Sequence, residues 1–245
     1  MKSPNKVAVV TGASTGIGRA IAVEFTKRTS HIFLLARSKD KLEETKRLVE
    51  KNGGKAEVVV CDLTKIPSIN AAIASIKQKI SRVDVLVNVA GIWHGKNEVY
   101  ANTAFETFSQ QVIVDTYMVG TVAPTLLAHG LVPLMKKGSN IINISGTFES
   151  GAKGWLPYFV SKRAIEDLTI GLSQELRDKR IQVNAISPSD VATEEYKKYF
   201  PQYIADAISP LEIAKFAVHI CSDNAITGKI FVLKKGKEPF EKFHA

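Results

Sequence analysis

The chain has 245 residues, of which 45% are hydrophobic, so it can bury a large core as one domain. Its formal net charge is +9, but Lys and Arg alternate with Glu along stretches such as KDKLEETKRLVEKNGGK, and no basic-aromatic stripe indicates nucleic-acid binding. No run of about 18 apolar residues predicts a membrane span, and the N-terminal MKSPNK lacks the apolar region of a signal peptide. Cys61 and Cys221 have no His or Cys neighbours that would predict a metal site, so we expect buried free thiols in a cytoplasmic protein.

In chain order, short apolar strands alternate with amphipathic helices. The strands are expected at 7–11, 32–36, 56–60, 83–88, 140–145, 181–185 and 229–233, and the helices near 17–28, 39–51, 67–80, 107–129 and 158–178. A further helix begins at SPLE, where Ser209 is the N-cap and Glu212 reaches back to it. This alternation predicts an α/β protein, with a Rossmann-type doubly wound parallel sheet of about seven strands in a single domain over 1–245. The polar and aromatic segment 189–209 is either a lid over a pocket or a surface helix.

The first strand leads into TGASTGIG, which places Gly12, Gly16 and Gly18 at a strand-to-helix turn. Glycines let the backbone approach a pyrophosphate, and the start of the following helix offers unpaired N–H groups. The spacing is neither G-x-G-x-x-G nor a P-loop, because Arg19 and Ala20 stand where a nucleotide triphosphatase needs Lys and Ser or Thr. The turn therefore predicts a dinucleotide site.

The second strand ends in Ala36-Arg37-Ser38. An NAD site usually has an acid here for the ribose 2′-hydroxyl, whereas an Arg accommodates a 2′-phosphate. Ala36 and Arg37 therefore predict NADP(H) as the cofactor. The alternative is a surface arginine at the start of a helix.

Farther along, Tyr158 precedes Lys162 by four residues, a spacing that places both side chains on one face of a helix. A phenol ordinarily titrates near ~10, and a nearby ammonium favours the phenolate and lowers that pKa. The same spacing also occurs by chance in many chains, so the rest of the sequence has to decide whether Tyr158 carries acid/base chemistry.

TGASTGIG, NVAG at 88–91 and YFVSK at 158–162 together resemble the motifs of the short-chain dehydrogenase/reductase family, as do CDLT (61–64), VDVLVNVAG (83–91), IINIS (141–145) and IQVNAISPSDVAT (181–193). The resemblance implies hydride transfer between a nicotinamide and a carbonyl or alcohol. Tyr158 would move the proton, Lys162 would hold the nicotinamide ribose, and a serine would orient the carbonyl. It also implies a homodimer or homotetramer, with the helices near 107–129 and 158–178 between subunits. The cofactor-binding residues that it implies, besides Tyr158 and Lys162, are Gly12, Ser14, Gly16, Ile17, Gly18, Asp62, Leu63, Asn88, Ala90, Gly91, Val191 and Thr193.

The chain departs from the family at several positions. Counting back from Tyr158 selects Ser145 as the serine, whereas aligning the strand puts Gly146 at the catalytic position; we expect Ser145, because Gly146 has no hydroxyl. Where the family has a helical Asn that helps to hold a water near the lysine, this chain has Tyr117. Smaller changes are Val89 for the second Asn of Asn-Asn-Ala-Gly, Pro188-Ser189 for Pro-Gly, and a C-terminus without the usual glycine pair.

The expected substrate is an uncharged, bulky carbonyl or alcohol, because the residues expected around it are mostly apolar and aromatic. His94 is either an additional acid or a structural loop histidine. A rival function is a cofactor-binding protein with little turnover, acting as a sensor or interaction partner. The residues expected to face the pocket are Ile92, Trp93, His94, Phe148, Trp155, Tyr196, Tyr199 and Phe200.

Overall fold

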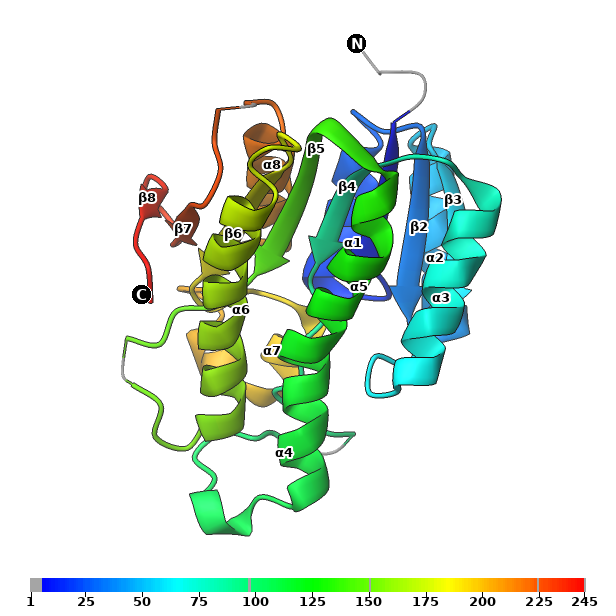
Figure 1. The fold of residues 1–245 in the computed structure, drawn as a ribbon. Coiled ribbons are helices and arrows are strands. Elements are labelled where there is room, and N and C mark those ends of the chain that lie inside the picture. Colours follow the sequence, from blue (N-terminus) through cyan, green and yellow to red (C-terminus); the bar gives the residue numbers. More distant parts are fainter. Residues whose placement is uncertain (1–5, 97, 150, 224, 245) are drawn as a thin grey trace.

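The computed structural model describes residues 6–96, 98–149, 151–223 and 225–244, and its centre is one eight-stranded sheet with helices on both faces (Figure 1). The sheet order is β3-β2-β1-β4-β5-β6-β7-β8, with parallel neighbours except for the antiparallel pair β7 and β8. The expected doubly wound α/β class is confirmed. Residues 1–5, part of the segment that showed no signal-peptide pattern, lie outside the described residues. The strands are β1 (Val7–Thr11), β2 (His31–Ala36), β3 (Lys55–Val60), β4 (Val83–Asn88), β5 (Met135–Ile144), β6 (Gln182–Pro188), β7 (Ile230–Leu233) and β8 (Phe240–Glu241).

Helices follow most strands, as the apolar periodicity predicts. At the start of α8, Ser209 and Glu212 form the expected capping box, in which each side chain pairs with the other residue's backbone N–H. The helical elements of the described residues are α1 (Gly16–Phe25), α2 (Lys39–Lys51), α3 (Ile66–Lys79), η1 (Phe105–Thr107), α4 (Gln110–Tyr117), the π-helical turn η2 (Met118–Val122), α5 (Ala123–Leu131), η3 (Val132–Leu134), α6 (Leu156–Glu175), α7 (Glu194–Tyr199), η4 (Pro201–Tyr203) and α8 (Pro210–Ile220).

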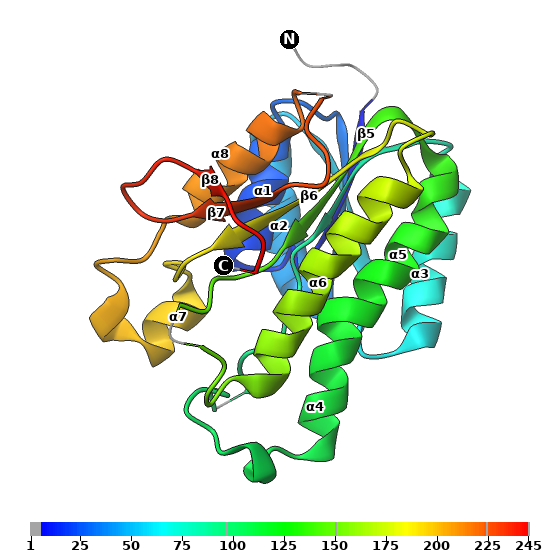
Figure 2. The same cartoon turned by 60° about the vertical axis from the view of Figure 1, so that its left-hand side comes forward.

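The core has two layers, one on each face of the sheet. On one face, α3, α5 and α6 cover the sheet, and side chains such as Ile76 and Leu127 are fully buried there. On the opposite face lie α1, α2 and α8 (Figure 2), and Phe25 and Ile213 are fully buried there. Strands buried on both faces explain why the sequence shows continuous apolar runs rather than alternation.

The structure differs from the expected elements in two places. The helix expected over 107–129 is broken into η1, α4, η2 and α5, and within η2 a Cβ at Gly120 would lie 2.7 Å from Cβ of Ser161, so α6 packs directly against this backbone. The antiparallel β8 was missed, because its exposed two residues lie in the polar sequence KKGKEPFEKFHA.

The run Gln110–Leu134 has a mean hydropathy of 1.3 and is long enough to cross a membrane by length and composition, although the sequence analysis expected no span. In the structure this run comprises α4, η2, α5 and η3, and its own side chains Leu127 and Leu131 are fully buried. Its α5 packs against the sheet, and a helix of this kind meets the same length and composition criteria as a membrane span.

Candidate active site

The glycine turn after β1 has the geometry that the sequence predicts. Gly12 and Gly16 have φ of +63° and +53°, values that favour glycine, and a Cβ at Gly18 would lie 2.2 Å from the carbonyl oxygen of Gly12. Helix α1 begins in this turn, and the unpaired N–H groups at its N-terminus favour binding of an anion. The guanidinium of Arg19 braces it by donating to the carbonyl of Ser14 and pairing with Glu44 at 2.8 Å.

At the end of β2, Arg37 is exposed and is preceded by Ala36, in the position where an NAD site usually has an acid. The nearby Asp62 begins the loop after β3. Burial works to raise the pKa of the Asp62 carboxyl, but hydrogen bonds from Thr64, with the charges of Lys65 and Arg37, bring it below its usual value. This end of the cleft therefore combines a carboxylate held by Thr64 with the exposed guanidinium of Arg37, whose charge acts on that carboxylate.

Beyond β4, the backbone is held close to the glycine turn. The Thr11 hydroxyl accepts hydrogen bonds from the backbone N–H groups of Val89 and Ala90. Beneath this loop the Asn88 amide donates to Asn143, whose amide in turn donates to the Thr169 hydroxyl, each at 2.9 Å. Asn88 therefore supports the loop from below rather than lining the cleft.

Tyr158 and Lys162 share one face of α6, as expected. The Lys162 ammonium is buried, lies 5.4 Å from the centroid of the Tyr158 ring and donates to the carbonyl of Ile144 at 2.7 Å. A Cβ at Gly91 would lie 3.2 Å from this ammonium, so glycine permits the close approach of the β4 loop.

The pKa of Tyr158 corrects an expectation. The sequence predicts that Lys162 lowers this pKa, but burial and the Asp190 carboxylate raise it above the ordinary value. The physical reason is that burial favours the neutral phenol, while the ammonium lies over the ring and is engaged with Ile144. Burial also lowers the pKa of Lys162 to about 8, against the opposing effect of Glu166.

The Ser145 hydroxyl has a partner other than the one expected. It lies 2.6 Å from a carboxylate oxygen of Glu166 and 3.0 Å from the carbonyl of Lys162, so it points into α6. The pleat of β5 accounts for this, because Asn143 and Ser145 face α6 on alternate positions. At Gly146 the nearest atom to a Cβ would be the Phe148 ring at 3.9 Å, which leaves this position open. The structure therefore favours the alignment that places Gly146 at the catalytic position.

Tyr117 ends α4 where the π-helical turn begins. Single π turns inside helices are frequent at functional sites. Among the described residues, Val119 of this turn lines the cleft and Tyr117 does not. The Tyr117 ring therefore does not take the place of the asparagine side chain that the family has near its lysine.

Aromatic side chains from three loops meet at the outer end of the cleft. The Phe200 ring lies 6.3 Å from Trp93 and 6.0 Å from Trp155, between ring centroids, which joins the 189–209 segment to the loops after β4 and before α6. Tyr199 packs on Trp93 outside the lining residues, and the His94 ring bonds locally to the carbonyl of Gly95 at 2.7 Å. Those expected pocket residues that line the cleft are Ile92, Trp93, His94, Phe148, Trp155, Tyr196 and Phe200.

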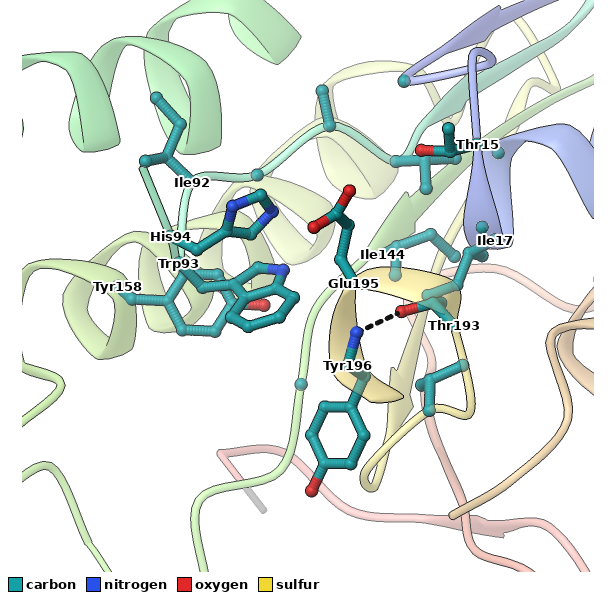
Figure 3. A pocket seen from close by; sticks show the side chains of 18 of the residues that line it. Thr15, Ile17, Ile92, Trp93, His94, Ile144, Tyr158, Thr193, Glu195 and Tyr196 are labelled. Atoms are coloured by element: carbon teal, nitrogen blue, oxygen red, sulfur yellow. Dashed lines mark hydrogen bonds between the residues drawn. The ribbon is translucent and has the colours of Figure 1, made fainter. Parts of the chain in front are cut away.

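Sequence reasoning missed the acidic groups of the site. The Tyr196 hydroxyl donates to the Asp190 carboxylate, which also acts on Tyr158, while Glu195 lines the same pocket (Figure 3). Thr193 caps α7 by accepting the N–H of Tyr196 at 3.1 Å, which fixes where this helix begins. The position of Asp190 directly after a strand could have indicated a site residue in the sequence. No sequence pattern distinguishes Glu195 from the other polar residues of its short helix.

These groups meet in one cleft of about 1150 Å³ that runs along the carboxyl ends of the strands. Between β1 and β4 the strand order reverses direction, the position at which doubly wound sheets bind ligands. The glycine turn, in which a Cβ at Gly18 would collide with the backbone of Gly12, together with the buried Lys162 beside Gly91, fits a nicotinamide dinucleotide. The predicted residues that line this cleft are Gly12, Ser14, Gly16, Ile17, Gly18, Arg37, Asp62, Leu63, Ala90, Gly91, Ser145, Tyr158, Lys162, Val191 and Thr193.

Fold and cleft thus define the class of dinucleotide-binding α/β oxidoreductases. The chain matches the short chain dehydrogenase family over residues 6–203, and it belongs to that family. It is 33% identical over 193 residues to glucose 1-dehydrogenase 2 of Bacillus subtilis (strain 168), covering 77% of this chain and 73% of that protein.

Two solved structures are similar over almost the whole chain. L-sorbose reductase from Gluconobacter frateurii, complexed with NADPH and L-sorbose, has a TM-score of 0.84 at 29% identity, covering 96% of this chain and 97% of that one. Landomycin C-6 ketoreductase, with bound NADP and rabelomycin, has a TM-score of 0.80 at 26% identity, covering 93% and 94%.

Proposed function

We propose that this protein is an NADP(H)-dependent oxidoreductase that interconverts a carbonyl and an alcohol, with Tyr158 as general acid/base. The observation that carries the proposal is that Tyr158 and the buried Lys162 lie in the same cleft as the glycine turn. The bound nicotinamide would supply or accept the hydride. Gly12, Gly16 and Gly18 would hold the pyrophosphate, and Asp62 and Leu63 would flank the adenine.

At the reactive end, Tyr158 would give its proton to the carbonyl oxygen during reduction. With its pKa above the ordinary value the phenol is protonated at neutral pH, so the proton to be donated is present, whereas the reverse role as a base would require that pKa to be lowered. Lys162 would hold the ribose and place positive charge near the developing oxyanion. Val191 and Thr193, which line the same cleft, would contact the carboxamide.

The choice of NADP(H) over NAD(H) rests on Arg37. Its side chain is exposed at the end of β2, and the preceding residue is Ala36 rather than an acid. A guanidinium suits a phosphate because it can donate two parallel hydrogen bonds. The reported complexes of L-sorbose reductase with NADPH and of landomycin C-6 ketoreductase with NADP agree with this choice.

The test is NADPH oxidation with a panel of aldehydes, ketones and quinones, with Tyr158→Phe as the control. Turnover that Tyr158→Phe abolishes would support the proposal. Turnover that survives this substitution would contradict the role of Tyr158.

A second candidate is a cofactor-binding protein with little turnover. The Ser145 hydroxyl points into α6 and Tyr117 replaces the family Asn, so two groups that assist the tyrosine in the family are displaced or absent. Tight NADPH binding without any Tyr158-dependent turnover across the panel would favour this candidate.

The aromatic residues at the outer end of the cleft favour a bulky, uncharged substrate. Phe200 and Tyr196 line the cleft from the 189–209 segment, so we infer that this segment is a lid. Replacement of Phe200 by Ala should raise KM for bulky carbonyls more than for small ones.

For assembly, we infer a homodimer or homotetramer that buries the outer faces of α4 and α6. Val114 and Val160 on these helices are 53% and 39% exposed. Mass measurement by light scattering, with Val114→Glu as the disruptive variant, would test this. We also infer a reducing, cytoplasmic location from the free and buried Cys61 and Cys221.

A further inference from the structure

Glu166 is a fully buried carboxylate behind the reactive pair. One of its oxygens accepts the Ser145 hydroxyl at 2.6 Å, and the other accepts the backbone N–H of His244 at 2.7 Å. Nη1 of Arg163 lies 3.6 Å from the same carboxylate. A buried carboxylate is tolerated only when it is paired and hydrogen-bonded, so these partners, from the residue after β5, from α6 and from the C-terminal segment, account for its position.

The C-terminal segment reaches Glu166 by a defined path, and we call residues 240–244 the tail. Phe240 pairs with Val232 across β8 and β7, and the N–H of Lys242 donates to Ile230 at 3.0 Å. Farther along, the His244 ring lies 3.4 Å from Asp167 of α6. The red tail in Figure 2 follows β7 and then turns toward α6. The tail therefore joins the edge of the sheet to the helix that carries Tyr158 and Lys162.

We propose that Glu166 is a positioning residue for Lys162 and Ser145, and that the tail holds Glu166 in place. The inference rests on the proposed function, because it concerns the same site. Glu166 follows Lys162 by four residues on α6, so its charge lies one helical turn behind the ammonium. It also keeps the Ser145 hydroxyl turned into the helix and away from the cleft.

The charged groups around Lys162 and Glu166 determine in which direction the pKa of Lys162 should change when the Glu166 charge is lost. Lys162 is faced by Tyr158 and Glu166 on its own helix, and Asp190 of the loop after β6 acts on Tyr158. Around Glu166 lie Arg163 and Asp167 on α6 and His244 on the tail. Burial lowers the pKa of Lys162 while Glu166 raises it, so loss of the Glu166 charge should leave the amine neutral at a lower pH.

Glu166→Gln removes the charge and preserves the hydrogen bonds. The amide oxygen can accept the His244 N–H, the amide nitrogen can donate to Ser145, and Ser145 can then donate to the Lys162 carbonyl, which is already 3.0 Å away. We expect the alkaline limb of the kcat profile to move to lower pH by about one unit, a roughly tenfold loss of kcat above it, with KM changed less than about twofold. An unchanged profile would overturn the proposal.

The tail is tested by a chain that ends at Lys242, which removes the His244 N–H, against the matched control His244→Ala, which keeps that N–H and loses the ring. The shortened chain should shift the profile in the same direction as Glu166→Gln, and the control should not. In the Glu166→Gln background the shortening should add little, since coupled groups are not additive. The role of the tail would be contradicted if the pH shifts of the shortening and of Glu166→Gln added in full, or if His244→Ala shifted the profile as much as the shortening does.

A readout without turnover separates this inference from the proposed function. In cofactor-free protein with ¹³C-labelled lysine, the Cε resonance of Lys162, assigned with Lys162→Met, should titrate near pH 8 in the parent and lower in Glu166→Gln. Equal midpoints would overturn the inference even if turnover is normal. A lowered midpoint in a protein that turns over no carbonyl would instead support the inference and contradict the proposed function.

Discussion

The Ser145 hydroxyl lies 2.6 Å from the Glu166 carboxylate, and both groups are buried. Removal of this hydroxyl in Ser145→Ala would leave a buried carboxylate one donor short. We expect a loss of about 1–3 kcal/mol in the free energy of unfolding, with kcat lowered less than about fivefold. Urea denaturation and kinetics on the same preparation measure both. A loss of kcat greater than about a hundredfold without a loss of stability would show that Ser145 orients the substrate instead.

Gly146→Ser is the complementary change. A Cβ at this position would meet only the Phe148 ring, at 3.9 Å, so the backbone can accept a side chain there. Because the catalytic position of the family falls on Gly146 in the strand alignment, we expect the added donor to raise kcat about threefold to tenfold. A kcat equal to or below that of the parent would count against this alignment.

Tyr158→Phe should remove turnover while cofactor binding remains. The expected loss is about 10²–10⁴-fold in kcat, the usual contribution of a positioned acid. NADPH affinity, followed by fluorescence titration, should change less than about threefold, since the glycine turn and Arg37, which are proposed to hold the phosphates, are left unchanged.

Carbonyl reduction should depend on pH through Lys162. Its folded-state pKa of about 8 means that the ammonium is present at pH 6–7 and is lost as the pH rises through 8. The raised pKa of Tyr158 keeps the phenol protonated throughout this range. The rate should therefore be level at neutral pH and fall above about 8, as measured by kcat in buffers of constant ionic strength. A rate that rises between pH 7 and 9 would exclude this assignment of the ammonium.

Arg37→Ala should weaken NADPH binding selectively. We expect a loss of roughly 1.5–3 kcal/mol in NADPH affinity with little change for NADH, because a charge-assisted contact to phosphate is removed. The matched control is Arg47→Ala, which removes the same charge from an exposed position of α2 outside the cleft. Equal losses for the two variants would mean that the net charge of the protein, rather than a contact, governs affinity.

The sequence predicts those parts of the site that depend on local spacing. The glycine turn and the Tyr158–Lys162 pair each lie within one strand–turn–helix or one helix, so periodicity places them correctly. Glu166 could not be found in this way, because its partner His244 is 78 positions away and only the folded chain brings them together. The pKa of Tyr158 was assigned the wrong direction because spacing reveals the nearby ammonium but not the burial or Asp190.

The reversal of strand order between β1 and β4 has a consequence for how ligands affect the whole molecule. The groups proposed for the adenosine end come from β1 to β3, whereas Tyr158 and Lys162 follow β5. A dinucleotide lying along the cleft would therefore contact both the half of the chain that holds β1 to β3 and the half that holds β4 to β8. Bound dinucleotide should make the two halves unfold together. A cut in the backbone between β3 and β4 would leave each fragment with only part of the binding cleft.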